Sequence, residues 1–170
     1  MKHTTNRRQF QFTLLALPWA LGTSIAKAHG DAHAKPTAPV VKEQKPWGIA
    51  AEPNQAQRTI EILMTDDMKL SPSHLDVREG ETLRLRAINK GKVLHEIVIG
   101  TSAELAEHAK MMKKFPTMEH DEPYMAHVAP GQRGDVVWTF NRPGDFEFAC
   151  LIAGHFEAGM RGTIRVTPKA

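Results

Sequence analysis

The chain has 170 residues and one cysteine, so its length suits one compact domain with tails, and an internal disulfide framework is excluded. The formal net charge is +3, but four of the 22 lysines and arginines lie in residues 1–28, which hold no acid; the remainder has 18 basic against 19 acidic residues, formally −1. The composition therefore gives no argument for nucleic-acid binding, and none is expected.

Residues 1–28 have the three parts of an export signal. A basic start with Arg7 and Arg8 precedes an apolar stretch at 12–25 and a small-residue cleavage site that ends at Ala28. The apolar stretch is shorter than the roughly 20 residues of a membrane span. We therefore expect cleavage after Ala28, no membrane span after cleavage, and a periplasmic protein. The paired arginines resemble a twin-arginine signal, and an ordinary secretory leader with two chance arginines is the alternative.

Residues 29–57 are interpreted as a flexible tail and linker, because prolines recur there and packed apolar runs are few. After cleavage His29 would carry the free α-amino group, and His33 lies four positions further on. These nitrogen donors could capture Cu(II) weakly. We favour a plain disordered tail, because His-rich tracts are compositional hints only. The predicted domain spans residues 58–170.

The predicted domain reads as strands separated by turns that contain glycine and proline. Alternation is clearest at residues 82–87, where Leu83, Leu85 and Ala87 would be buried and the arginines exposed. Similar patterns predict strands at residues 59–64, 74–77, 93–99, 135–140, 145–150 and 160–166. Strands at this spacing are typical of an antiparallel sandwich, an all-β fold.

Residues 102–114 interrupt the β-pattern. Ser102 as N-cap, acidic residues early and lysines late predict one short helix of about three turns, inserted between strands and ending before Pro116.

Soft donor side chains are dense from this helix to residue 127. They are His108, Met111, Met112, Met118, His120, Met125 and His127. We favour the interpretation in which some methionines pack the helix onto the sandwich and the histidines face solvent, because Met commonly fills irregular gaps. A weak second copper site for Cu(I) in segment 108–127 is the alternative.

One loop holds the only cysteine, Cys150, with His155 and Met160 following at intervals of five. A thiolate, an imidazole and a thioether suit copper better than calcium, magnesium or a structural zinc. Strand parity points Cys150 inward, and it also points His95 inward from the strand at 93–99, which makes His95 the candidate for a second imidazole. Each residue alone has an ordinary packing explanation. The combination favours a metal site.

These residues resemble the cupredoxins, the blue-copper proteins that include plastocyanin, azurin, auracyanin and rusticyanin. The resemblance lies in His95 followed by Cys150-x4-His155-x4-Met160, with a glycine directly before His155 and before Met160. The loop spacing is similar to that of auracyanin and rusticyanin. The resemblance implies a Greek-key β-sandwich with one type 1 copper held by His95, Cys150, His155 and Met160.

Glu96 departs from the family pattern. Many cupredoxins carry Asn or Ser directly after the first histidine, where it helps to tie the two ligand-bearing segments together, and an ionised carboxylate cannot donate that hydrogen bond. With Met118 to Asp121 and Phe146 to Cys150, the His95-Glu96 pair makes the chain look most like the periplasmic cupredoxins associated with bacterial copper tolerance.

Two functions follow from the resemblance. The domain is either an electron carrier that serves a redox partner protein, or a tolerance protein that binds or oxidises surplus copper from the periplasmic copper pool with its extra His and Met residues. An enzyme of the multicopper-oxidase type is not expected, because no His-x-His pair occurs and Cys150 is flanked by Ala149 and Leu151. We expect a monomer.

Overall fold

The computed structural model describes residues 41–118 and 120–169. The predicted signal peptide, His29 and His33 lie outside these residues. Within the described residues, no helix is long and apolar enough to cross a membrane.

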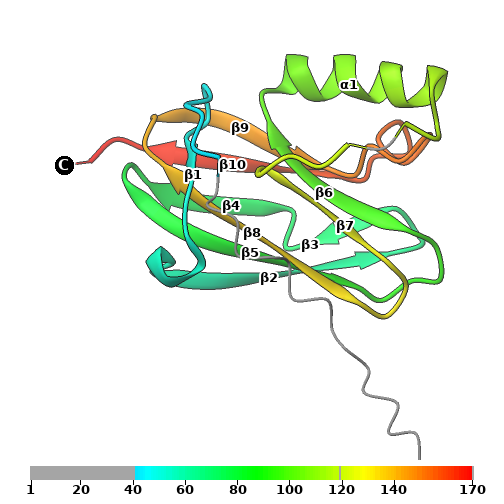
Figure 1. Ribbon diagram of the computed structural model, residues 1–170, viewed down its shortest axis with the longest axis horizontal. Helices are drawn as coiled ribbons and strands as arrows, with labels where there is room; N and C mark the ends of the chain where they lie inside the picture. The colour runs from blue at the N-terminus through cyan, green and yellow to red at the C-terminus, as the bar shows by residue number, and fades with distance from the viewer. Residues whose placement is uncertain (1–40, 119, 170) are drawn as a thin grey trace, which may run out of the picture. The chain divides into compact units, whose positions relative to one another are not determined.

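In the described part of the chain, ten strands form two five-stranded sheets, with one α-helix outside them (Figure 1). In the first sheet the strand order is β1 (Ile49–Ala50), β8 (Arg133–Phe140), β5 (Glu81–Asn89), β2 (Arg58–Thr65) and β3 (Lys69–Ser71). In the second it is β4 (His74–Arg78), β10 (Arg161–Thr167), β9 (Gly144–Ala149), β6 (His95–Gly100) and β7 (Met125–Val128). The predicted all-β sandwich of the cupredoxins with one inserted helix is confirmed.

The core lies between the two sheets because apolar residues alternate with polar ones along most strands. Leu83, Leu85 and Ala87 of β5 are fully buried, as predicted. The arginines between them face outward, where Arg84 and Arg86 pair with Asp135 of β8. Successive side chains of β5 therefore divide between core and solvent.

Two strand pairs are parallel, whereas the sequence predicted an antiparallel sandwich. β2 pairs with β5, and β4 pairs with β10, each in parallel register. The short turn at Glu79 and Gly80 carries the chain from β4 in one sheet to β5 in the other. Because β4 and β5 lie in different sheets, they do not form a hairpin with each other. Each pairs instead with a strand distant in sequence, and the alternation of residues within a strand does not specify the direction of that partner.

The segment before β2 packs onto the domain, which differs from the expected linker over residues 29–57. Trp47 is only 4% exposed, and its carbonyl oxygen accepts a hydrogen bond from the indole N–H of Trp138 at 3.1 Å. β1 pairs with β8, and a 3-10 turn at Pro53–Gln55 follows. Burial of a tryptophan and coverage of the β8 edge explain this packing. The folded domain therefore begins before Arg58.

Helix α1 (Ser102–Lys114) lies over the sheet that contains β6 and β9 (Figure 1). Its N-cap is Thr101, not the predicted Ser102, because Thr101 forms a capping box with Glu104. The helix buries Leu105, Ala109 and Met112 against the sheet. In consequence every residue of β6 is buried, including Glu96.

The packing interpretation of the methionines is confirmed for some of them. Met112 and Met125 are buried at 3% and 2% exposure beneath the helix, and Met118 packs against the same cluster. Met111 is 47% exposed and packs little.

Candidate metal centre

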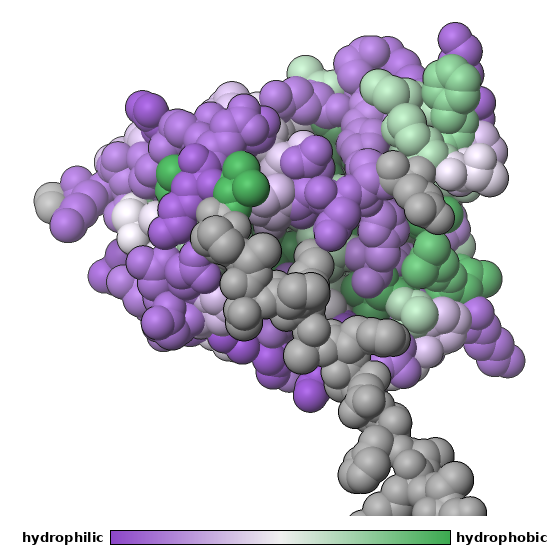
Figure 2. Space-filling model, in the orientation of Figure 1, coloured by the Kyte–Doolittle hydropathy of each residue, from purple (hydrophilic) through white to green (hydrophobic). Residues whose placement is uncertain are grey.

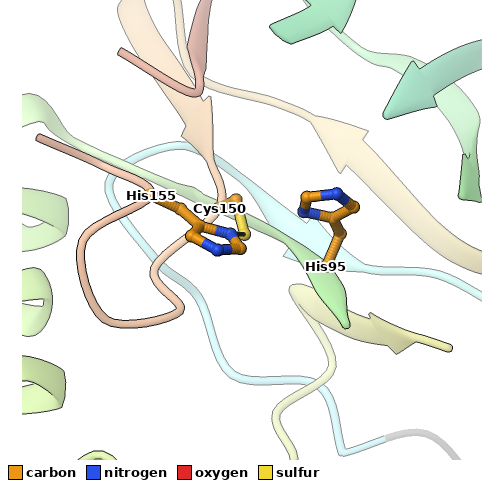
Figure 3. Close-up of side chains that lie close together, drawn as sticks. All are labelled: His95, Cys150 and His155. Atoms are coloured by element: carbon orange, nitrogen blue, oxygen red, sulfur yellow. Dashed lines mark hydrogen bonds between the residues drawn. The ribbon is translucent and has the colours of Figure 1, made fainter. Parts of the chain in front are cut away.

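Three of the predicted ligands come together at one end of the second sheet (Figure 3). His95 begins β6, Cys150 directly follows β9, and His155 lies in the loop between β9 and β10. Because β6 and β9 are antiparallel neighbours, the first two residues are adjacent in space. One donor atom from each of the three residues lies within 4.8 Å of the other two. Cys150 Sγ is 3.3 Å from His155 Nδ1.

The loop from Cys150 to Met160 is held by its own backbone. The Cys150 N–H donates to the Met160 carbonyl at 3.0 Å, and the Met160 N–H donates to the His155 carbonyl at 3.1 Å. Gly154 and Gly159 have φ of +90° and +93°, in the left-handed region that favours glycine. Their positions directly before His155 and Met160 allow the two reversals that fold the loop back on itself.

Met160 is fully buried in the core, directly before β10. Its backbone contacts Cys150 and His155 as described, which brings it to the base of the same loop. The role of the Met160 thioether as a ligand stays a prediction.

The protonation of the three close donors follows from their burial. Burial raises the pKa of the Cys150 thiol from 9.0 to about 12, against the lowering effect of the Glu96 and Ile152 N–H groups. The metal-free thiol is therefore protonated at neutral pH, and a metal must displace its proton. Burial, and next the charge of His95, lower the pKa of His155. Its imidazole is neutral at pH 7 and able to bind a metal.

Asp66, in the turn after β2, orients His95. His95 Nε2 lies 3.1 Å from Asp66 Oδ1, and Asp66 Oδ2 accepts the Lys92 N–H at 2.7 Å. That backbone hydrogen bond, followed by the contact with His95, holds the pKa of Asp66 below its ordinary value. The carboxylate is thus an acceptor, which places the His95 hydrogen on Nε2 and leaves Nδ1 as a lone-pair donor.

His95 Nδ1 is buried and has no hydrogen-bond partner among the described residues. A buried nitrogen with a free lone pair is costly unless something binds it. Together with the neighbouring thiol of Cys150 and the imidazole of His155, it forms a soft donor set that fits copper. The residues present therefore fit the metal that the sequence predicted.

Glu96 ties the two ligand-bearing segments together, although not as a donor from its side chain. Its backbone N–H donates to Cys150 Sγ at 3.4 Å, and its Oε1 accepts the Leu151 N–H at 2.9 Å. The carboxyl group is fully buried. The Glu96 side chain therefore links the two segments as an acceptor of a backbone hydrogen bond.

Asp66 was not predicted from the sequence as part of the site. Asp66 is 29 positions from His95, and no spacing rule relates the two. The only local signal is an acidic residue in a turn, which is common at the surface.

Comparisons with known proteins agree with this geometry. The family model described as "Copper binding proteins, plastocyanin/azurin family" matches residues 57–167. The copper-resistant cuproprotein CopI of Rubrivivax gelatinosus is 46% identical over 138 residues, with 81% of this chain and 82% of that protein covered. CopI of Pseudomonas aeruginosa is 33% identical, with 95% and 98% covered.

Solved structures share the fold. Auracyanin B superposes with a TM-score of 0.57 at 23% identity, covering 71% of this chain and 95% of auracyanin. An azurin from Methylomonas sp. strain J gives 0.55 at 18% identity, with 66% and 99% covered. The buried His95–Cys150–His155 group lies on this fold, and the chain belongs to the plastocyanin/azurin family of copper-binding proteins.

Proposed function

We propose that this chain is a periplasmic type 1 copper protein that transfers electrons in the service of copper tolerance. One copper would be held by His95, Cys150 and His155, with Met160 as the weak axial ligand. The observation that carries the proposal is the group of three close donors, His95, Cys150 and His155. Asp66 holds the hydrogen of His95 on Nε2, and the lone pair on Nδ1 has no partner among the described residues.

The protein residues would keep the site rigid. His95 begins β6 and Cys150 directly follows β9, the strand paired with β6, and both residues are fully buried. Backbone hydrogen bonds hold the loop that carries His155. Copper bound there would supply a one-electron couple between Cu(I) and Cu(II). A pocket that does not rearrange between these states supports fast electron transfer, because little reorganisation accompanies each step.

Exposed apolar side chains beside the ligands support docking of a redox partner there. His155 is partly exposed, and Val93 and Leu94, directly before His95, are 44% and 43% exposed. Figure 2 shows hydrophobic surface at the right-hand end, where the β5–β6 loop lies in Figure 1. Exposed apolar side chains beside a buried centre favour brief docking of a partner protein. We infer that the electron leaves through His155, from a monomer.

Copper tolerance is inferred from relatives named copper-resistant cuproproteins. A second candidate function is copper sequestration, in which the protein removes surplus copper without electron transfer. The observation that favours it is the set of further imidazoles in segment 108–127, which an electron carrier does not require. Both functions need the protein to be exported by the predicted signal.

The test of the function uses a bacterium that lacks the corresponding gene. Cys150→Ser removes the only thiol, so the copper-loaded protein should lose its strong visible absorption and the strain its growth on copper. Asp145→Ala, at an exposed surface ion pair with Arg165, is the control and should retain both. Full tolerance with the colourless Cys150→Ser variant would refute the electron-transfer proposal and favour sequestration.

The test of export replaces the paired arginines. Arg7→Lys together with Arg8→Lys should leave uncleaved precursor in the cytoplasm if the twin-arginine interpretation holds. Undiminished periplasmic protein would indicate the general secretory route instead.

A further inference from the structure

Three histidines outside the copper centre lie together. His108 comes from α1, His120 from the segment after it, and His127 from β7. The ring centres of His108 and His120 are 4.6 Å apart, and those of His120 and His127 are 5.7 Å apart. From the sequence, we favoured histidines that face solvent, and a weak second copper site for Cu(I) in segment 108–127 was the alternative. The fold instead brings three imidazoles from three different segments into one cluster, and the copper centre uses none of them.

These ring separations suit a shared ion. An imidazole nitrogen binds a divalent transition metal at about 2 Å, so the ring centre lies about 3 Å from the ion. Two rings on one ion then have centres roughly 4.5–6 Å apart, depending on the angle between the bonds. The separations of 4.6 and 5.7 Å fall in this range.

A buried carboxyl group faces the cluster. Glu96 is fully buried, and its Oε2 lies 3.0 Å from His127 Nε2. Glu96 and His127 are directly opposite each other in the β6–β7 pair. Among the described residues, Glu96 Oε2 has no partner with hydrogen-bond geometry, whereas Oε1 is engaged by the Leu151 N–H. One carboxylate oxygen is therefore directed toward the imidazoles.

The central histidine is prepared as a donor. His120 Nε2 is buried without a hydrogen-bond partner in the described part of the chain. The other ring nitrogen, Nδ1, lies 3.4 Å from the Met118 carbonyl oxygen. A hydrogen on Nδ1 directed at that oxygen leaves a lone pair on Nε2. Burial, and next the charge of His120, lower the pKa of His108, so this imidazole is also neutral and available.

We propose that His108, His120, His127 and Glu96 form a second metal site, which binds Cu(II) through three imidazoles and one carboxylate. Nitrogen and oxygen donors without a thiolate are the set that Cu(II) accepts in tetragonal geometry. Of the described residues, only the first centre has three donor atoms within 4.8 Å of one another. The second site must therefore close by side-chain rotation, and it binds more weakly than the first.

The two sites share Glu96. Its backbone N–H contacts Cys150 Sγ, one carboxylate oxygen holds the residue after Cys150, and the other oxygen faces His127. A metal ion that pulls on Oε2 must change the hydrogen bonds around the thiolate. Occupation of the second site should therefore shift the visible absorption of the first, and the two affinities should be linked reciprocally. This coupling rests on the proposed type 1 centre, whereas the second site does not.

The binding test removes the first centre, so that failure of the two proposals can be told apart. Mature protein with Cys150→Ser and His155→Ala, and with His29→Ala and His33→Ala to remove the predicted tail donors, is titrated with Cu(II). We expect one equivalent with the electron paramagnetic resonance signal of nitrogen-ligated Cu(II) that lacks a thiolate. His108→Ala and His120→Ala should each abolish it.

The matched control is His74→Ala, an exposed histidine on β4 that pairs with Thr163 and Asp76. It should retain the equivalent. Circular dichroism confirms that each variant is folded. Absence of this equivalent, or its survival in both His108→Ala and His120→Ala, would overturn the site. Displacement of the Cu(II) by equimolar Zn(II) would overturn the assignment to copper, because copper binds nitrogen donors more tightly.

The coupling test uses the protein with its cysteine intact. A second equivalent of Cu(II) should shift the visible band of the first, and the shift should vanish in His120→Ala. Glu96→Gln retains an oxygen acceptor for the Leu151 N–H and removes the acidic ligand, so it should weaken the second site more than about tenfold. An unchanged visible band on filling the second site would refute the coupling alone.

Discussion

Asp66 provides the sharpest test of how the fold prepares the proposed copper centre. Its carboxylate is the acceptor for His95 Nε2–H at 3.1 Å, and it is itself held by the Lys92 N–H at 2.7 Å. His95 is fully buried, whereas the Asp66 side chain is 39% exposed. Asp66→Ala would leave the ring without the contact that selects its tautomer and orientation. Partners of this kind typically contribute about 10–100-fold to metal affinity.

The exposure of Asp66 sets the expected size of the effect. Water can replace part of the missing acceptor at a half-exposed position, so we expect the low end of that range, about tenfold weaker copper binding in Asp66→Ala. Asp66→Asn keeps an oxygen that can accept from Nε2–H and should be affected less. Removal of the negative charge should also raise the reduction potential in both variants, because a nearby anion stabilises Cu(II) relative to Cu(I).

The assay is competition for copper against a chelator of known affinity, combined with voltammetry of the loaded protein. The control is Asp67→Ala, because Asp67 is the next residue and interacts with Thr65 and Lys69 but not with His95. Equal copper affinity and equal potential in the Asp66→Ala and Asp67→Ala variants would refute the argument that Asp66 orients His95.

Three further predictions concern the ligands and the fold. Met160→Leu should retain copper and raise the potential, whereas His95→Ala should release the metal, because an axial donor tunes a site more than it holds the ion; equal copper loss by elemental analysis would contradict this. Burial raises the pKa of Cys150 from 9.0 to about 12, so the folded metal-free protein holds this proton more tightly than the unfolded chain. The contribution of this bound proton to the free energy of unfolding is complete below pH 9 and declines toward pH 12, by up to about 1.4 kcal/mol per pH unit. In urea unfolding measured across this range, the Cys150→Ser variant should not show the decline. Trp47→Ala should lower the free energy of unfolding by about 3–5 kcal/mol, because Trp47 belongs to the core; no change would restore the linker interpretation.

The sequence by itself determined the features that depend on residues near one another along the chain. Cys150, His155 and Met160 lie within eleven positions, and two glycines mark the reversals, so their common loop was visible from spacing. Alternation identified β5, β8 and β10, because one face of each strand meets the core and the other meets solvent. The short strands β3 and β7 carry too few residues for this period to be recognised.

Tertiary structure decided everything that depends on contacts between distant segments. Nothing in the sequence around Glu96 indicates that it is buried, but α1 packs over β6 and Glu96 is fully buried. Asp66 meets His95, and His127 meets Glu96, only because strands distant in sequence become neighbours. Trp47 was interpreted as part of a linker because prolines recur around it, and its partner, Trp138, is 91 positions away. Spacing along the chain does not predict such contacts, since they form only when the two sheets pack on a shared core.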